Sequence, residues 1–530
     1  MNQTFRKKLL VTLIAGLALP MVASAADADL LKRLEALSRE IETLRAQVKA
    51  SEEKVNNLAA KSDTVAVADL KGKVQRLEDK SLSKWLTVGG DYHFRADSLR
   101  GEVINHLGIT GFDPSTGNPI MAPISNYKPK NSSLFTNRFG LDLNAKATQD
   151  VSVTARLAMY KVFGSQSDAA LTNAGAAPFF ADRVGVFDGT VSHVPSDSRL
   201  NVDRVFATWS NIADQEMWFS VGRRPSTGGA PTNLRTNNPR PGNGGTPALL
   251  VDYAFDGMTL GYAPEIDALP GAYAKVCYGV GFESGFSRTG NSIKDTTMLG
   301  VALVPIDTDP LRVWLQWNRG MQIFDNPVMS NTFFSDTRPT TNLGDIDWFG
   351  LGAMSTFKMV GSGNLHVFAD WGLSRTKPNN NLTMGTLGLL TGNFAGPAEA
   401  ANNKTGTAIA LGMRYDLPTK TKIGLEYNRG SKNWITFAPA AGDMFTSKYG
   451  TRGDVWEAYL IQELDLMPIS SYTSRAFFRL GVQHYNFKYT GSNNWVGKPI
   501  AMSDVTGATP LTMAPLKNAT DIYATFEVKF

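Results

Sequence analysis

The chain of 530 residues has one cysteine, Cys277, and no run of 18 apolar residues. A single cysteine excludes an intrachain disulfide, haem attachment through CxxCH and a zinc site built from cysteines. The five histidines show neither i, i+4 pairing nor an HExxH motif, so we expect no metal and no cofactor. Without a long apolar run there is no transmembrane helix, and a membrane-spanning chain would have to be a β-barrel.

Charge is also scarce, at 19% Asp, Glu, Lys and Arg. The formal net charge is +5, but residues 1–25 hold three basic residues and no acidic one, so the remainder carries only +2. A basic surface for nucleic acid is therefore not expected. There is no Walker loop and no GxSxG nucleophile elbow, and we predict that the protein is not an enzyme. A Ser–His pair assembled across strands, as in a barrel phospholipase, stays open as an alternative.

Residues 1–25 have the pattern of a secretory signal peptide, with basic Arg6 to Lys8, an apolar run and the cleavage site Ala23-Ser24-Ala25. Leucines, isoleucine and valines then recur at 4-3 spacing from Leu30 to Leu77, which predicts a periplasmic coiled coil over residues 26–82. Self-association as a dimer or a trimer would follow. A single amphipathic helix lying on the barrel is the alternative.

From Trp85 the period changes from seven to two. In WLTVGGDYHFRAD, apolar residues share one face and ionisable ones the other, as in a wall between lipid and a polar lumen. The last residues, DIYATFEVKF, alternate in the same way and end on an aromatic residue. Phe526, Val528 and Phe530 resemble the signal that the barrel-assembly machinery reads.

The same alternation predicts an all-β transmembrane antiparallel barrel of about 16 strands over residues 83–530, preceded by the α-helical stalk. Short connections alternate with long ones rich in Asn, Gly, Thr and Pro. Asp256-Gly257 would normally indicate a hairpin, but splitting the segment 248–263 would give seventeen strands and invert the loop pattern, so we keep it as one strand. The predicted strands are 85–98, 134–147, 151–163, 201–210, 216–224, 248–263, 272–285, 296–305, 311–323, 345–359, 364–377, 405–416, 421–434, 452–464, 473–489 and 519–530.

Between Met217 and Val251 there is no acidic residue, yet four arginines occur around the third long loop: Arg223, Arg224, Arg235 and Arg240. In sixteen-stranded porins this loop commonly folds into the lumen, and guanidinium groups bind carboxylate, phosphate or sulfate through paired hydrogen bonds. We therefore predict an electropositive pore constriction. The alternative is an exposed loop whose arginines meet water or lipopolysaccharide.

Strand parity also directs further charges into the lumen, where they would either orient solutes in a transverse field or brace the wall. The basic ones are Arg95, Arg138, Arg156, Arg204, Arg312, Arg414 and Arg479. The acidic ones are Asp91, Asp142, Asp370, Glu426 and Glu457.

The segments GRRPSTGGAP (222–231), IGLEYNRGSKNW (423–434), TRGDVWEAYL (451–460) and YTGSNNWVGKP (489–499) resemble a family of largely uncharacterised bacterial outer-membrane proteins. Its members pair an N-terminal coiled coil with a porin-like barrel, related in architecture to siderophore-type porins. The resemblance implies a channel for small solutes and assigns no catalytic residues. The absence of CxxC removes one feature of barrels that sheathe multihaem cytochromes.

These observations predict a Gram-negative outer-membrane porin that passes small, anionic solutes, with its stalk in the periplasm. Two alternatives remain, a structural anchor that spaces the envelope and a receptor-like channel for a metal chelate. The expected partners are outer-membrane lipid and lipopolysaccharide, the barrel-assembly machinery, further copies of the chain through the coiled coil, and peptidoglycan.

Overall fold

The computed structural model describes residues 85–530 apart from 116–118, 166–194, 227, 243–245, 287–291, 328, 333–334, 439–441 and 468–473, together with residues 42–43, 46–47 and 49. The predicted signal peptide and nearly all of the predicted coiled coil lie outside the described residues. Contacts divide the chain into two units, Met1–Thr87 and Val88–Phe530. The second unit holds the fold described below.

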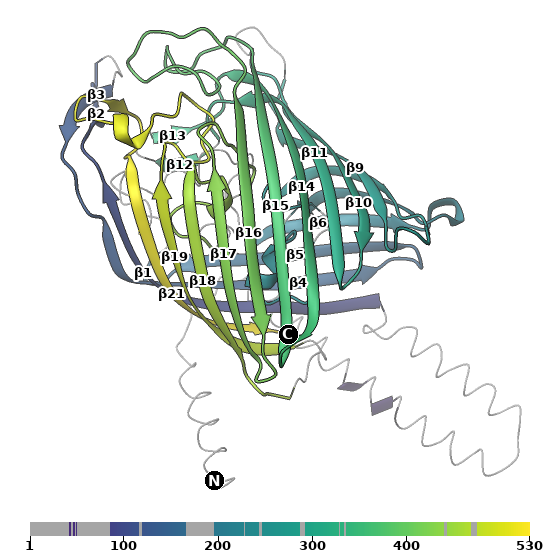
Figure 1. Cartoon of the computed structure of the whole chain (residues 1–530). Helices are drawn as coiled ribbons and strands as arrows, with labels where there is room; N and C mark the ends of the chain where they lie inside the picture. Colours follow the sequence, from purple (N-terminus) through teal and green to yellow (C-terminus); the bar gives the residue numbers. More distant parts are fainter. Residues whose placement is uncertain are drawn as a thin grey trace, which may run out of the picture. The chain divides into compact units, whose positions relative to one another are not determined.

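Sixteen antiparallel strands close into a barrel in which β1 pairs with β21 (Figure 1). Closure leaves no sheet edge, so every strand finds a hydrogen-bonded neighbour on both sides. The barrel strands are β1 (Leu86–Val103), β4 (Lys130–Lys146), β5 (Val151–Val162), β6 (Asn201–Ser210), β7 (Met217–Ser226), β8 (Tyr253–Tyr262), β9 (Tyr273–Phe282), β10 (Thr296–Asp307), β11 (Leu311–Phe324), β14 (Asn342–Val360), β15 (Gly363–Pro378), β16 (Thr405–Asp416), β17 (Thr421–Gly430), β18 (Gly453–Glu463), β19 (Arg475–Phe487) and β21 (Leu516–Lys529).

All sixteen predicted strands are therefore confirmed, with shifts of a few residues at their ends. Asp256 and Gly257 lie inside β8, paired with Val280 and Gly279 of β9, as the parity of the strand count required. Gly257 faces the backbone of β9 so closely that a Cβ there would come 2.0 Å from the Tyr278 carbonyl oxygen. The glycine thus permits close packing of the wall rather than a turn.

The connections alternate in length around the barrel. Short turns at one end, the short-turn end, span 147–150, 211–216 (with the 3-10 turn η3, Ile212–Asp214), 263–272, 308–310, 361–362, 417–420 and 464–474. The other, long-loop end carries loops L1 (104–129), L2 (163–200), L3 (227–252), L4 (283–295), L5 (325–341), L6 (379–404), L7 (431–452) and L8 (488–515). Shorter elements lie in these loops: β2 (His106–Phe112), β3 (Pro119–Ile124), α6 (Thr232–Arg235), β12 (Met329–Thr332), β13 (Ser335–Thr337), η5 (Lys448–Gly450), η6 (Met502–Asp504) and β20 (Pro510–Leu511).

The outward face of the wall is apolar and the inward face is polar. Val276, Phe478 and Ile522 point outward and are about half exposed, whereas their strand neighbours Lys275, Arg479 and Asp521 point inward and are buried. An apolar outer surface around a charged interior suits a barrel whose outside meets lipid.

The interior is packed with loops. Twenty-three buried residues from the wall and from L3, L6, L7 and L8 form an apolar cluster inside the barrel. Three indoles anchor it, because Trp348 donates to the Ile435 carbonyl (2.8 Å), Trp434 to Tyr449 (2.7 Å) and Trp495 to Phe324 (2.6 Å). A sixteen-strand barrel would be expected to hold a wide aqueous channel, and for this part of the lumen that expectation is wrong.

Among the described residues, no helix combines the length and apolarity needed to cross a membrane.

Candidate functional site

Loop L3 enters the lumen and is held against the inner wall through its short helix α6. Three cations from three strands donate to consecutive carbonyls at the end of this helix: Arg414 to Leu234, Arg479 to Arg235 and Lys529 to Thr236, each at 2.6 Å. The last carbonyls of a helix have no partner within it and carry partial negative charge, so cations stabilise them. Strands β16, β19 and β21 thereby fix the loop by its backbone.

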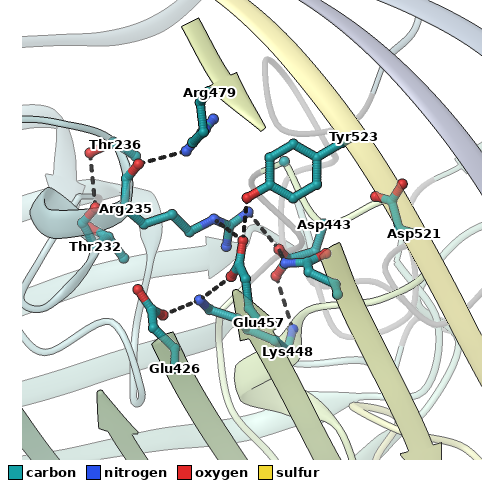
Figure 2. A network of polar contacts seen from close by, with 12 residues as sticks. Thr232, Arg235, Thr236, Glu426, Asp443, Lys448, Glu457, Arg479, Asp521 and Tyr523 are labelled. Atoms are coloured by element: carbon teal, nitrogen blue, oxygen red, sulfur yellow. Dashed lines mark hydrogen bonds and ion pairs between the residues drawn. The ribbon is translucent and has the colours of Figure 1, made fainter. Parts of the chain in front are cut away.

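Arg235 continues from this helix into a buried cluster of charges (Figure 2). Its Nη2 lies 2.7 Å from Asp443 of L7, and its Nε lies 3.2 Å from Glu457 of β18. Lys448, also from L7, contacts Glu426 and lies 2.7 Å from Glu457, which further accepts a hydrogen bond from the Tyr523 hydroxyl (2.7 Å). L3 and L7 therefore dock on the same part of the wall and share the carboxylate of Glu457.

The carboxylates around Arg235 hold its guanidinium in the charged state. Arg235 is 8% exposed, and burial alone would lower its pKa. The carboxylates of Asp443 and Glu457 outweigh burial and hold the pKa of Arg235 above its ordinary value. Arg235 is consequently a structural cation and offers no free guanidinium to a solute.

The structure does not bring the four predicted constriction arginines together, so a single four-arginine constriction is wrong. Arg223 lies on the outward face of β7, where it pairs with Asp256 at 3.9 Å, while Arg224 lies on the inward face. Arg240 reaches the short-turn end and pairs with Asp309 at 3.0 Å. Consecutive strand residues face opposite ways, and L3 is long enough to separate the remaining two.

The twelve predicted lumen charges all lie on the inward side of the wall, and most have partners there. Arg95 binds Asp97 (2.5 Å) and Asp521 (2.7 Å), and Arg479 binds Glu527 (2.8 Å). Arg312 contacts Asp307, Arg414 contacts Asp416, and Asp370 accepts from the Trp314 indole. Seven of the twelve predicted charges make these contacts or belong to the buried cluster around Arg235. They are Arg95, Arg312, Arg414, Arg479, Asp370, Glu426 and Glu457.

The remaining five line the wall of β1, β4, β5 and β6, and part of this wall is open to solvent. Arg156 lies 2.6 Å from both Asp91 and Asp142, and Arg204 lies 3.8 Å from Asp142. The Asp142 side chain is 45% exposed and that of Arg204 25%. Arg138 faces the same side of β4. Water therefore reaches this wall near the short-turn end.

Several residues of the site carry no signal in the sequence pattern. Asp443 and Lys448 lie in L7, whose inward course depends on the apolar cluster around Trp434 and Phe437. Asp521, Tyr523 and Glu527 stood on the predicted polar face of the last strand, but alternation alone could not indicate their partners. Among the described residues, no group of three or more His, Cys, Asp or Glu side chains could hold a metal ion.

The C-terminal strand closes the barrel through its backbone. Phe530 donates to the Gly90 carbonyl (3.0 Å) and Gly90 donates back to Phe530 (2.8 Å). Phe526 packs outside against Phe478 with ring centroids 5.0 Å apart, and Val528 shares its face.

The family model described as Protein of unknown function (DUF3373) matches residues 128–530. No curated protein matches the chain. Among solved structures, the barrel is similar to Pseudomonas putida OprB (11% identity, 87% of this chain and 97% of that chain, TM-score 0.43). It is also similar to an anion-selective porin from Comamonas acidovorans (12%, 84% and 99%, TM-score 0.39) and to the trimer form of Vibrio cholerae OmpT (14%, 84% and 100%, TM-score 0.37). The strand pairing described above, rather than these likenesses, establishes the barrel.

Proposed function

We propose that this chain, which belongs to the family described as Protein of unknown function (DUF3373), forms an outer-membrane channel for small, anionic solutes. The observation that carries the proposal is the closed barrel of sixteen strands with an apolar outside, a charged inside and a loop folded into the lumen. Short turns then lie on the periplasmic side and long loops outside the cell.

The solute path enters at the short-turn end along the wall of β4 to β6. Opposite this wall the lumen is filled by L3 and L7, and the charges there are buried, as with Glu457 at 0% and Lys448 at 1% exposure. Along β4 to β6, by contrast, Asp142 and Arg204 keep contact with water. A path limited to one side of the lumen admits only small solutes.

Anion preference is supported by two inward-facing cations that carry no carboxylate partner among the described residues. Arg224 of β7 donates to the hydroxyls of Ser220 and Thr259, and Lys275 of β9 donates to Thr246 at 3.0 Å. Fixed charges of one sign set the selectivity of a pore. The other inward arginines have acidic partners nearby, so their fields largely cancel.

Reconstitution of the chain in planar bilayers tests this function. We expect discrete single-channel conductance and, in a salt gradient, a reversal potential on the anion-selective side that moves toward zero in Arg224→Gln. Absence of conductance would overturn the channel, and cation selectivity of the wild type would overturn the anion preference.

The C-terminal strand supports a second proposal, that the barrel-assembly machinery inserts the chain. The remaining expected partners, namely lipopolysaccharide, peptidoglycan and further copies of the chain through residues 26–82, stay predictions, as does the role of the stalk as an envelope spacer.

A further inference from the structure

A cavity of about 40 Å³ lies between the returning half of L3 and the wall formed by β7 to β11. Polar side chains line it from both sides: Thr246 from L3, and Arg224, Cys277, Gln316 and Asn318 from the wall. Gly257, Gly279 and Gly300 also line it on the side of the wall. One water needs roughly 10–15 Å³ of such space, so the cavity has room for a few waters or one small ion.

The cations at this cavity have no carboxylate partner among the described residues. Arg224 contacts the side chains of Ser220, Thr259 and Cys277. Lys275, 4% exposed, donates to the Thr246 hydroxyl, whose own hydrogen is then left to point into the cavity. Buried cations are costly without a partner of opposite charge.

Two nearly inaccessible amides also leave hydrogen-bonding atoms unmatched. Asn318 is 3% exposed and Gln316 8%, and the Gln316 Nε2 donates to the Asn318 Oδ1 at 2.9 Å. The Gln316 Oε1 and the Asn318 Nδ2 then have no partner in the part of the chain that the structure describes. If the side-chain amides of both residues are rotated by about 180°, one donor and one acceptor are again left without a partner among the described residues. The site therefore calls for a ligand that both accepts and donates a hydrogen bond.

We infer that this cavity is a binding site for a small oxyanion that retains a hydroxyl group, the class of hydrogen phosphate and hydrogencarbonate. The oxyanion oxygens face Arg224, the Thr246 hydroxyl and the Asn318 amide, and the ligand hydroxyl donates to Gln316. The inference rests on the proposed function in one respect, since it names the chemical class of anion that the channel selects. The binding site itself exists in the protein whether or not current flows.

Isothermal titration of the full chain in detergent, in a buffer free of oxyanions, tests the site with three probes: sodium phosphate, sodium hydrogencarbonate and sodium nitrate. We expect saturable binding of one phosphate or one hydrogencarbonate per chain, and at least tenfold weaker binding of nitrate, which has no hydroxyl to donate to Gln316. Equal affinity for nitrate would overturn the hydroxyl requirement, and no saturable heat with either phosphate or hydrogencarbonate would overturn the site.

Two variants locate the site and one serves as control. Arg224→Gln removes the charge and should weaken binding at least tenfold. Asn318→Asp places the missing carboxylate in the cavity and should abolish binding with almost no change of volume. Arg312→Gln, on the same wall but paired with Asp307, should leave the affinity unchanged; binding that survives both cavity variants would overturn the assignment.

Conductance of the same preparations separates this inference from the proposed function. Current without oxyanion binding overturns the site and leaves the channel. Oxyanion binding without current overturns the channel and leaves the site.

Discussion

Replacing Arg235 by methionine should release L3 from the wall and raise the time that the channel spends in a wide conductance state. Arg235 is the only side chain that joins L3 to both Asp443 of L7 and Glu457 of β18 in the described part of the chain. Methionine keeps most of the side-chain volume but leaves both carboxylates without this cation. The barrel wall should remain intact, because none of its strand pairs involves residues 227–252.

The free-energy cost of this substitution depends on which partners Asp443 and Glu457 keep. Removing one partner of a buried pair costs about 3–5 kcal/mol. The lower figure applies here, since Glu457 keeps Lys448 and Tyr523, and Asp443 keeps hydrogen bonds from Gln483 (2.7 Å) and the Lys448 amide (3.0 Å). A loss of about 3 kcal/mol raises the population of undocked L3 roughly a hundredfold, because each 1.4 kcal/mol is about tenfold.

Single-channel recording measures this change as the fraction of time in the high-conductance state. Arg240→Gln is the matched control in the same loop, because its pair with Asp309 is solvent-exposed, at 62% and 72%, and such pairs contribute only about 0–1 kcal/mol. Electrophoretic mobility with and without heating reports whether the barrel is folded. If Arg235→Met and Arg240→Gln open equally often with folded barrels, L3 is not the element that narrows the lumen.

Three further changes test other parts of the structure. Trp348→Ala removes a fully buried indole from the apolar cluster inside the barrel and should lower the free energy of unfolding by about 3–5 kcal/mol; a urea midpoint equal to that of wild type would contradict the packed lumen. Lys448→Met leaves two carboxylates without their shared cation and should cost about 3–5 kcal/mol in the same titration, whereas Lys420→Met, at an exposed turn pair, should change little. Phe530→Ala should reduce the amount of barrel assembled in cells but not refolding in detergent, because the hydrogen bonds with Gly90 use only the backbone; equal loss in both assays would show that the side chain acts in folding rather than in recognition.

The wall of the barrel could be predicted from the sequence because its determinants are local. Alternation of apolar and polar residues fixes which face each side chain takes, and connection length fixes which end each strand reaches. The requirement for an even number of strands also argued against a hairpin at Asp256 and Gly257, and both residues lie within β8. The same rule applied to the predicted strand 216–224 would have separated Arg223 from Arg224, since neighbours on a strand face opposite sides.

The interior could not be predicted because its contacts join segments far apart in the chain. Arg235 meets residues more than 200 positions away, and Lys448 belongs to a loop whose sequence has no periodicity to place it. The inward charges were identifiable by parity, but whether each faces water or a partner depends on which loops fold inward. That depends in turn on tertiary packing around Trp348, Trp434 and Trp495.

This packing changes which inward charges are candidates for a function. Charges are most numerous on the inward side of β16 to β21 and β1. There each carboxylate contacts a cation, and each cation contacts a carboxylate or a backbone carbonyl. These contacts form a rigid support for L3 and L7. Arg224 and Lys275 lie on the opposite wall and have no carboxylate partner among the described residues. A solute is recognised where the protein leaves charge and hydrogen bonds unmatched, so we propose that selectivity depends on the cavity behind L3 rather than on the short helix α6.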